Sequence, residues 1–512
     1  MKKRIIALSV VAALGGFAGS ASAQVPAANH LAYSATGVGH ILYTPYFSTQ
    51  ESNVTAISIV NTDTVNGKAV KVRFRGASNS DDVYDFQVFL SPGDVWTAGI
   101  SKGADGRSQL ATTDKSCTLP ATVNGSFIVS RTATQAADRP AETREGYIEI
   151  LNMGDIWSDG SSGASITNNQ RLFTATKHVA GVAPCTSSVL SALTNENAAT
   201  YLRAPTSGLT GSWSILNVSK ILAYSYPMTA IEARYQEAAN GRGTKSTGKL
   251  VYWDQRDTPL TGTQIDANTA DPLFTQGTPR WVSAARYDLP DLSTPYTTRG
   301  DTFPVNERPT FQALELSDAI ATRQVVGEYT TIASIGGATD WVASFPTRRY
   351  FAAVRYTGTG APAAVYNPSA LNIYFNSGNT EMGSVSGAGA SYQLCQKLGM
   401  SSLAFWDLEE TSLNVDNIVI SPGTPFSLSL CGEVGVLGIN GPAAANSATF
   451  GSLTRTSVSV PYSQGWGSIT TPSADGLPMI VNQFTRVNNT TTNVYYGLNF
   501  LGKTTSLGTF NF

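Results

Sequence analysis

The sequence predicts an all-β protein built from two antiparallel β-sandwich domains, with a long irregular insertion and one short helix. Hydrophobic residues make up 42% of the 512 residues and charged residues only 14%, so the chain is globular but poor in charge. Short runs of alternating apolar and polar residues recur between polar turns, as in half-buried strands. Four cysteines fall as one pair in each half of the chain.

The first 23 residues are typical of a secretory signal peptide. Lys2, Lys3 and Arg4 precede a short apolar run, and Ala21-Ser22-Ala23 supplies the small residues of a cleavage site. We expect cleavage between Ala23 and Gln24 and export of the mature chain to the cell surface, the extracellular medium or the periplasm, where disulfides form. No later apolar run is long enough to predict a membrane span.

Residues 24–240 are predicted to form the N-terminal sandwich. In the run 67–75, Val70, Val72 and Phe74 alternate with Lys71, Arg73 and Arg75, which predicts one face in the core and one in water. Glu149, between two isoleucines, is likewise expected to point outward. The predicted strands are 41–47, 53–61, 67–75, 83–90, 95–100, 126–130, 145–153, 211–218 and 221–228.

Residues 241–309 are predicted to be a linker followed by an irregular insertion. Residues 240–249 are almost devoid of apolar side chains, and 254–309 are rich in Pro, Thr, Asp and Gly, which indicates a surface excursion with little regular structure. A short helix is predicted just before this segment, at 230–239.

Residues 310–512 are predicted to form the C-terminal sandwich. Its first element, 310–330, has helical spacing of Phe311, Leu314, Ile320 and Val325, with Asp318 and Glu328 on the outer side. The strands predicted after it are 340–345, 350–356, 402–408, 431–439, 479–485 and 493–500.

The charge balance argues against a nucleic-acid partner. The chain has 34 basic and 36 acidic residues, and 31 basic residues remain without those of the signal peptide. A nucleic-acid footprint would be strongly basic. Low charge instead favours close packing against neighbours, because little repulsion keeps molecules apart.

The cysteines Cys117, Cys185, Cys395 and Cys431 allow three pairings. Pairing within each half, Cys117 with Cys185 and Cys395 with Cys431, is the simplest interpretation. A metal site is disfavoured, because no CxxC spacing exists and the chain has three histidines.

Motifs for catalysis are weak. The run 243–249 is close to a phosphate-binding loop, but Leu250 stands where Ser or Thr is needed, so we interpret it as linker. The run 383–387 has Val385 in place of a nucleophilic serine. His30, His40 and His178 are the available bases, and none is placed by sequence beside a nucleophile. We therefore predict no enzymatic activity and no cofactor.

Two acidic clusters leave calcium as the one metal to consider, since it binds carboxylate oxygens. They comprise Asp81, Asp82 and Asp85, and Asp407, Glu409 and Glu410, and the simpler interpretation is surface charge at turns. Six tryptophans on or beside strands are interpreted as core anchors rather than a carbohydrate platform. These are Trp96, Trp157, Trp213, Trp341, Trp406 and Trp466.

The chain resembles a family of secreted bacterial sequences known only as "cell surface protein". The stretches that carry the resemblance are 56–100, DKSCTLP (114–120), TREGYIEILNMG (143–154), ATDWVASFPTRRYF (338–351), 395–410 and LCGEVGVLGIN (430–440). The resemblance implies immunoglobulin-like sandwiches on a Gram-negative envelope. It supplies no enzymatic residues, and the insertion at 254–309 is where this chain departs most.

We therefore expect a non-enzymatic envelope protein whose partners are copies of itself or other envelope components, as in a surface layer or coat. One alternative is an outer-membrane β-barrel channel, because the chain ends in Phe-Asn-Phe and residues 494–500 alternate. Another is a carbohydrate-binding adhesin that uses exposed aromatic residues.

Overall fold

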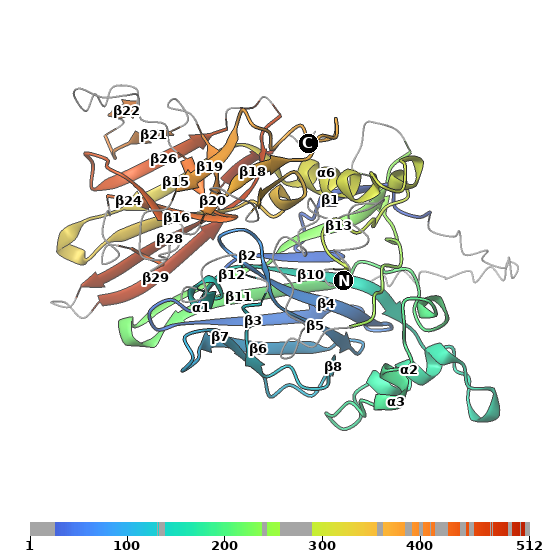
Figure 1. Cartoon of the computed structure of the whole chain (residues 1–512). Coiled ribbons are helices and arrows are strands. Elements are labelled where there is room, and N and C mark those ends of the chain that lie inside the picture. Colours follow the sequence, from blue (N-terminus) through green and yellow to red (C-terminus); the bar gives the residue numbers. More distant parts are fainter. Residues whose placement is uncertain are drawn as a thin grey trace, which may run out of the picture.

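The computed structural model describes residues 26–130, 132, 139–237, 243–255, 289–355, 362–384, 392–398, 403–409, 411–414, 429–440, 447–449, 455–471, 473, 475–489, 494–501 and 503–506. The predicted signal peptide and its cleavage site at Ala23 and Gln24 lie outside this part of the chain, as does the Val385 motif. The described part is mostly β, in several open, almost entirely antiparallel sheets (Figure 1). Strands pair only with strands of their own half, residues 26–255 (the N-half) or 308–506 (the C-half).

Two sheets of the N-half pack face to face as a β-sandwich. Phe86 and Trp96, which come from opposite sheets, pack with ring centroids 5.4 Å apart in the shared core. The first sheet runs in the order β1 (His30–Tyr33), β13 (Thr229–Tyr235), β2 (Ile41–Ser48), β10 (Glu145–Ile156), β4 (Gly67–Gly76), β5 (Asp82–Leu90) and β8 (Cys117–Leu119), with β14 (Thr244–Lys245) beside β13. The second runs β12 (Leu222–Pro227), β11 (Leu209–Asn217), β3 (Asn53–Asn61), β6 (Val95–Lys102), β7 (Ser108–Ala111) and β9 (Gly125–Ser126).

The C-half contains a second sandwich, in which Trp341 of one sheet lies 6.3 Å from Phe405 of the other, between ring centroids. Its outer sheet runs β22 (Ser412–Asn414), β21 (Leu403–Trp406), β26 (Gln464–Thr470), β15 (Ala321–Thr330) and β27 (Leu477–Pro478), with β30 (Lys503–Ser506) beside β15. Its inner sheet runs β25 (Arg455–Val458), β24 (Val434–Ile439), β16 (Ala338–Ser344), β28 (Ile480–Asn489) and β29 (Val494–Leu501). Two small sheets complete it, β17 (Ala352–Arg355) with β18 (Ala363–Tyr366), and β19 (Thr380–Ser384) with β20 (Tyr392–Lys397) and β23 (Ser429–Cys431).

Helices are few in the described residues. They are α1 (Arg139–Glu142), α2 (Asn168–Thr176), α3 (Ser187–Leu190) and α6 (Arg308–Ile320). Pro309 opens α6, where its missing N–H costs no hydrogen bond. No helix in this part of the chain has both the length and the apolar content to cross a membrane.

Three sequence predictions of local structure are wrong. The predicted helix 230–239 is largely strand β13, since Ile231 and Ala233 pack into the core from an eight-stranded sheet. The predicted helix 310–330 ends at Ile320, and β15 continues from Ala321, so tertiary pairing overrides the helical spacing. Of the predicted strand 126–130, only Ser126 is in a strand.

The outer face of the eight-stranded sheet is buried, which corrects the prediction that it meets water. Lys71, Arg73, Arg75 and Glu149 are 0–2% exposed. Residues 289–307, which we name the cover segment, lie across this face together with α6 and parts of the C-half. The start of the cover segment is therefore not the surface excursion that its composition suggested, and Asp291 is 1% exposed.

The buried charged groups on this face are paired with groups of opposite charge, which offsets the cost of removing them from water. We name these residues the ionic layer. On the β4 side, Arg73 Nη1 lies 3.3 Å from Asp82 Oδ2, Arg75 Nε lies 3.2 Å from Glu149 Oε1, and Lys71 contacts Asp85. Burial lowers the pKa of the Lys71 ammonium, and the Asp85 charge opposes that shift. An unpaired charge at such a depth would be strongly destabilising.

Asp291 joins the two halves within the ionic layer. Its Oδ2 lies 3.8 Å from Arg75 Nη2 of the N-half and 3.6 Å from Arg349 Nη1 of the C-half. Beside it, Arg348 Nε donates to Glu433 Oε1 at 3.1 Å. Burial raises the pKa of Glu433, and the Arg348 charge lowers it in part.

Phe484 makes the apolar contact between the halves. It projects from β28 into the N-half core, with its ring centroid 5.2 Å from Tyr224, 5.9 Å from Tyr46 and 6.0 Å from Trp213. Gly497 in β29 lets the backbones approach, because a Cβ there would lie 2.8 Å from the Ala223 carbonyl oxygen. Both hydrophobic cores thus contain residues from both halves.

We predict that F484A destabilises the protein by about 3–5 kcal/mol, the usual cost of truncating a buried phenylalanine. Because Phe484 joins the halves, chemical unfolding followed by tryptophan fluorescence should separate into two transitions. The control is F405A, inside the C-half sandwich, which should cost a similar amount without separating the transitions. A single cooperative transition in F484A would contradict the assigned role.

We predict that D291N costs about 3 kcal/mol of unfolding free energy, because two buried guanidinium groups lose an anionic partner. The matched control is D301N. Asp301 pairs with Lys249 and Arg308 at the surface and is 43% exposed, so its loss should cost less than about 1 kcal/mol. Equal effects of the two variants, measured by urea unfolding, would argue against the bridging role.

Glu315 on α6 predicts a pH dependence of stability. Burial raises its pKa from an ordinary value of 4.5 to about 7, although Thr297 donates a hydrogen bond to Oε2. A raised carboxyl pKa means that the stabilisation is complete below pH 4.5 and is lost as the pH rises through 7. E315Q should therefore match the wild type at pH 4.5 and be more stable by about 3 kcal/mol at pH 8.5. Urea unfolding at both pH values tests this, with the exposed E409Q as control, and an unchanged pH dependence in E315Q would contradict it.

Candidate functional site: an uncharged sheet face

The outer face of the six-stranded N-half sheet carries no charged side chain on the strands described here. We name it the uncharged face. It consists of the outward positions Val54, Ala56, Ser58 and Val60 of β3, Val95, Thr97, Gly99 and Ser101 of β6, Gln109 and Ala111 of β7, Thr210, Ser212, Ser214 and Leu216 of β11, and Ala223, Ser225 and Pro227 of β12.

The two-residue periodicity of the strands produces this face. In β3, Ile57 and Ile59 are buried, while the residues between them, Ala56 and Ser58, point away from the core. In β11, Trp213 is 1% exposed and points into the sandwich interior, while the serines on either side of it in the strand point outward. Large side chains thus anchor the sheet on one side, and small ones cover the other.

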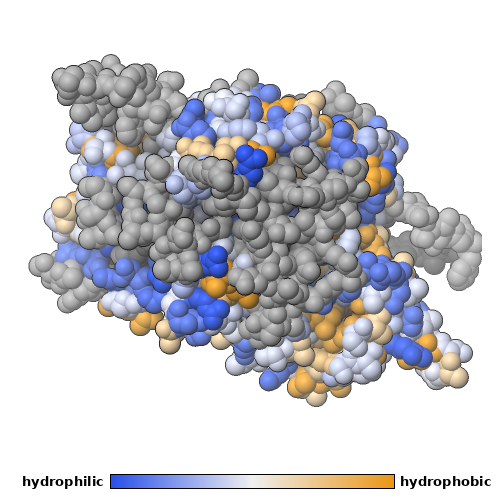
Figure 2. All heavy atoms as spheres, in the orientation of Figure 1, coloured by the Kyte–Doolittle hydropathy of each residue, from blue (hydrophilic) through white to orange (hydrophobic). Residues whose placement is uncertain are grey.

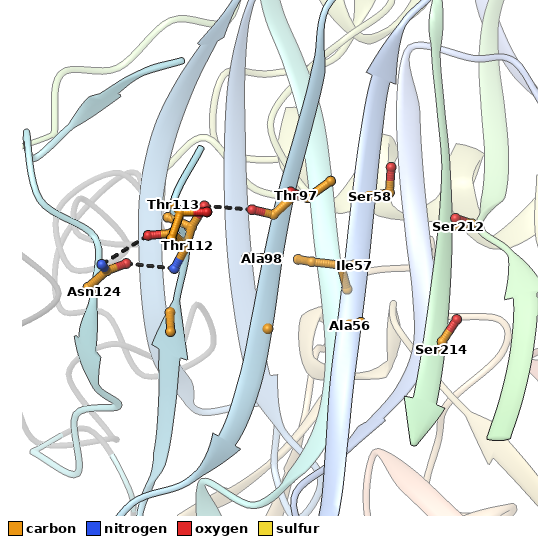
Figure 3. Close-up of a pocket in the computed structure, with 12 residues that line it drawn as sticks. Ala56, Ile57, Ser58, Thr97, Ala98, Thr112, Thr113, Asn124, Ser212 and Ser214 are labelled. Atoms are coloured by element: carbon orange, nitrogen blue, oxygen red, sulfur yellow. Dashed lines mark hydrogen bonds between the residues drawn. The ribbon is translucent and has the colours of Figure 1, made fainter. Parts of the chain in front are cut away.

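A hollow of about 590 Å³ opens on the uncharged face (Figure 3). It follows a row of small residues, because Ala56 stands opposite Ser214 on one side and Gly99 on the other, and Gly99 stands opposite Ala111. A parallel row contains Ser58 between Ser212 and Thr97. The hollow is lined by Ala56, Ile57, Ser58, Thr97, Ala98, Gly99, Ala111, Thr112, Thr113, Asn124, Ser212 and Ser214.

Asn124 closes one edge of the hollow by taking the place of a strand backbone. Its Oδ1 accepts a hydrogen bond from the Thr112 N–H at 2.8 Å, and its Nδ2 donates to the Thr112 carbonyl at 3.1 Å (Figure 3). The Thr112 hydroxyl donates to the Thr97 carbonyl at 2.6 Å. The Thr112 N–H and carbonyl are therefore satisfied and do not form an open strand edge at this point.

The lining offers hydroxyl, amide and methyl groups, and none of its residues titrates near neutral pH. Proton transfer needs a group with a suitable pKa, so this lining suits binding rather than acid–base chemistry. The side of the molecule shown in Figure 2 carries a mixture of hydrophilic and hydrophobic residues.

A second hollow, of about 400 Å³, lies among Val38, Thr62, Asp63, Thr206, Ser207, Gly208, Lys245, Ser246 and Thr247. The charge beneath it is already paired. Lys68 Nζ donates to Asp155 Oδ1 at 2.8 Å and to the Thr206 hydroxyl at 3.0 Å. We assign this hollow a structural role.

Ser91, His178 and Asp94 lie together, but not as a catalytic triad. His178 Nδ1 is 2.6 Å from Ser91 Oγ and 3.3 Å from Asp94 Oδ2, so both contacts use the same ring nitrogen. A triad needs the serine on one nitrogen and the acid on the other. The Ser91 N–H also donates to Asp94 Oδ2 at 3.0 Å, and the cluster closes the turn between β5 and β6.

His40 has a structural role. It accepts a hydrogen bond from the Ala233 N–H on Nδ1 at 3.0 Å, and its Nε2 lies 3.2 Å from the Ser246 carbonyl oxygen. Burial lowers its pKa to about 3, and the Lys68 charge adds to the shift. His30, in β1, contacts Asn29 through Nδ1 at 3.1 Å.

The run 243–249 forms the short strand β14, which pairs with β13, and an extended segment that begins no helix, so it lacks the helix N-terminus of a phosphate-binding loop. Of the acidic clusters, Asp82 and Asp85 pair with Arg73 and Lys71 in the ionic layer. Asp407 accepts hydrogen bonds from the N–H groups of Glu409 and Thr411 and shapes the turn after β21. Glu410 lies outside the described residues, among which no cluster of His, Cys, Asp or Glu is placed to hold a metal ion.

The four cysteines pair as the simplest interpretation predicted, Cys117 with Cys185 and Cys395 with Cys431. The first disulfide ties β8 to the segment before α3. The second joins directly opposed residues of β20 and β23. Two disulfides are consistent with an exported protein.

The tryptophans divide into two groups. Trp96, Trp213 and Trp341 are at most 1% exposed, which confirms that they anchor the cores. Trp157 and Trp406 are half-buried, and Trp466 is 39% exposed, so the core interpretation is wrong for Trp466. Because strand periodicity does not reveal which sheet face stays uncovered, the sequence missed both this residue and the uncharged face.

Comparison of the chain with protein-family models, with curated proteins and with solved structures finds no match.

Proposed function

We propose that this protein is an exported, non-enzymatic component of the cell envelope that assembles with copies of itself through the uncharged face. The observation that carries the proposal is the absence of charge from the outward positions of β3, β6, β7, β11 and β12. Support for export comes from the signal-like first 23 residues and from the two disulfides. Its location at the cell surface, in the medium or in the periplasm, and the immunoglobulin-like class of its sandwiches, are parts of this proposal.

The small side chains of the uncharged face favour a partner of the same kind. Burying charged groups requires their desolvation, and ordering long side chains costs entropy. The desolvation cost and the entropic cost are both small for short, uncharged side chains such as those of Ala56, Ser58, Gly99 and Ser212. Two copies of this face related by a twofold axis can pack face to face, with small uncharged side chains meeting small uncharged side chains.

The size of the uncharged face is adequate for such contact. β3 has nine residues and spans about 30 Å at about 3.3 Å per residue. The five strands span about 24 Å at about 4.8 Å per strand. The resulting area of about 700 Å² per copy is close to the roughly 800 Å² per partner of a standard interface.

The test is A56R, which places a charge at the centre of the uncharged face. We expect the wild type to self-associate in sedimentation velocity and A56R to weaken that association at least about tenfold, because an unpaired guanidinium would be desolvated. The control is V305R, at a position that is 60% exposed in the cover segment. A monomeric wild type at high concentration, with or without calcium, would overturn the proposal, as would equal effects of A56R and V305R.

A further inference from the structure

A stacked pair of tryptophans stands on the outer sheet of the C-half. Trp406 of β21 and Trp466 of β26 are directly opposed in register, and their rings stack at 3.8 Å between centroids with an interplanar angle of 7°. Trp466 is 39% exposed. Tryptophan is usually removed from water, so a stacked pair with one ring exposed and the other half-buried points to a binding role.

The backbone is built to hold this pair. Gly465 has a φ of +152°, and a Cβ there would lie 1.9 Å from the Trp406 carbonyl oxygen, so only glycine lets β26 approach β21 this closely. After β21, Asp407 Oδ1 accepts hydrogen bonds from two backbone N–H groups, at 2.9 Å from Glu409 and 2.8 Å from Thr411. The rings are thus ordered before any ligand arrives, which lowers the entropic cost of binding.

Trp466 has a polar cross-strand neighbour on the side away from Trp406. Trp406 occupies the β21 side of Trp466, so the other ring face is turned toward β15 on the opposite side of β26. There, Glu328 stands directly opposite Trp466 in register, and it is exposed. An aromatic ring beside a carboxylate presents an apolar surface and a hydrogen-bond acceptor at adjacent points.

We propose that Trp406, Trp466 and Glu328 form a subsite for a pyranose ring of a neutral glycan. The C–H face of a pyranose is apolar and stacks on an aromatic ring, while its hydroxyls donate to a carboxylate. The acidic groups Asp407 and Glu409 near the pair disfavour an anionic polysaccharide by charge repulsion. A patch about two side chains wide is too small for a stable protein interface, which needs roughly 800 Å² on each side.

Calorimetric titration of the full mature chain with cellohexaose, maltohexaose and mannohexaose tests the subsite, with an oligogalacturonate as the anionic probe. We expect at least one neutral hexasaccharide to bind and the oligogalacturonate not to bind. W466A should weaken binding about tenfold or more, and E328Q about fivefold, in line with the loss of one stacking contact and one hydrogen bond. W466F should retain part of the affinity, because it keeps an aromatic face.

The matched control is W157A, since Trp157 is half-buried and packs on Arg203, 4.1 Å from the guanidinium carbon to the ring centroid. It should bind as the wild type does, as should A56R, which separates this subsite from self-association. Absence of binding by all three neutral probes at millimolar concentration would overturn the inference. Preferential binding of the oligogalacturonate, or equal losses in W157A and W466A, would overturn it as well.

Discussion

The buried positive charges of β4 constrain the whole structure. Arg73 and Arg75 lie on the covered outer face of the eight-stranded sheet with no exposure to water, so each needs anionic partners at a defined position. Those partners come from neighbouring strands and, through Asp291, from a segment more than two hundred residues away. Arg349 of the C-half contacts the same Asp291 carboxylate. The N-half sandwich, the cover segment and the C-half thus meet at one buried carboxylate, and separating them would take Asp291 away from Arg75 or from Arg349.

Apolar packing supplies the stabilisation that ion pairing does not. Buried ion pairs contribute little net stability, because desolvation offsets most of the attraction, whereas burial of aromatic surface is clearly favourable. Phe484 contributes this second kind of contact, since it reaches from β28 into the N-half core. Charge thus selects the arrangement of the halves, and aromatic burial stabilises it.

This arrangement also determines which surfaces remain open. The C-half and the cover segment take up the outer face of the eight-stranded sheet, and the inner C-half sheet packs against the N-half (Figure 1). Among the described residues, the outer faces of the six-stranded N-half sheet and of the outer C-half sheet remain, and their chemistry differs. The face around Ala56 has small uncharged side chains, which suits contact with the same face of a second copy. The face around Trp466 combines an aromatic ring with carboxylates, which suits a polyhydroxylated ring. We therefore propose a separate binding role for each of the two sheets.

The sequence by itself determined the β class and most strands, because both depend on local alternation and spacing. It left three cysteine pairings open, and the structure shows the pairing within each half. Val70, Val72 and Phe74 identify β4 without knowledge of any neighbour. Only the tertiary structure decided the environment of Lys71, Arg73 and Arg75. Polar residues that alternate along a strand predict a face exposed to water, unless another layer of the protein covers that face and supplies oppositely charged groups. The same limit applies to β13 and β15, where long-range pairing overrides local helical spacing, and to Trp466. Which face of a sheet is covered depends on segments far away in the chain, so alternation alone could not distinguish an ionic layer from a solvated surface or an exposed tryptophan from a core one.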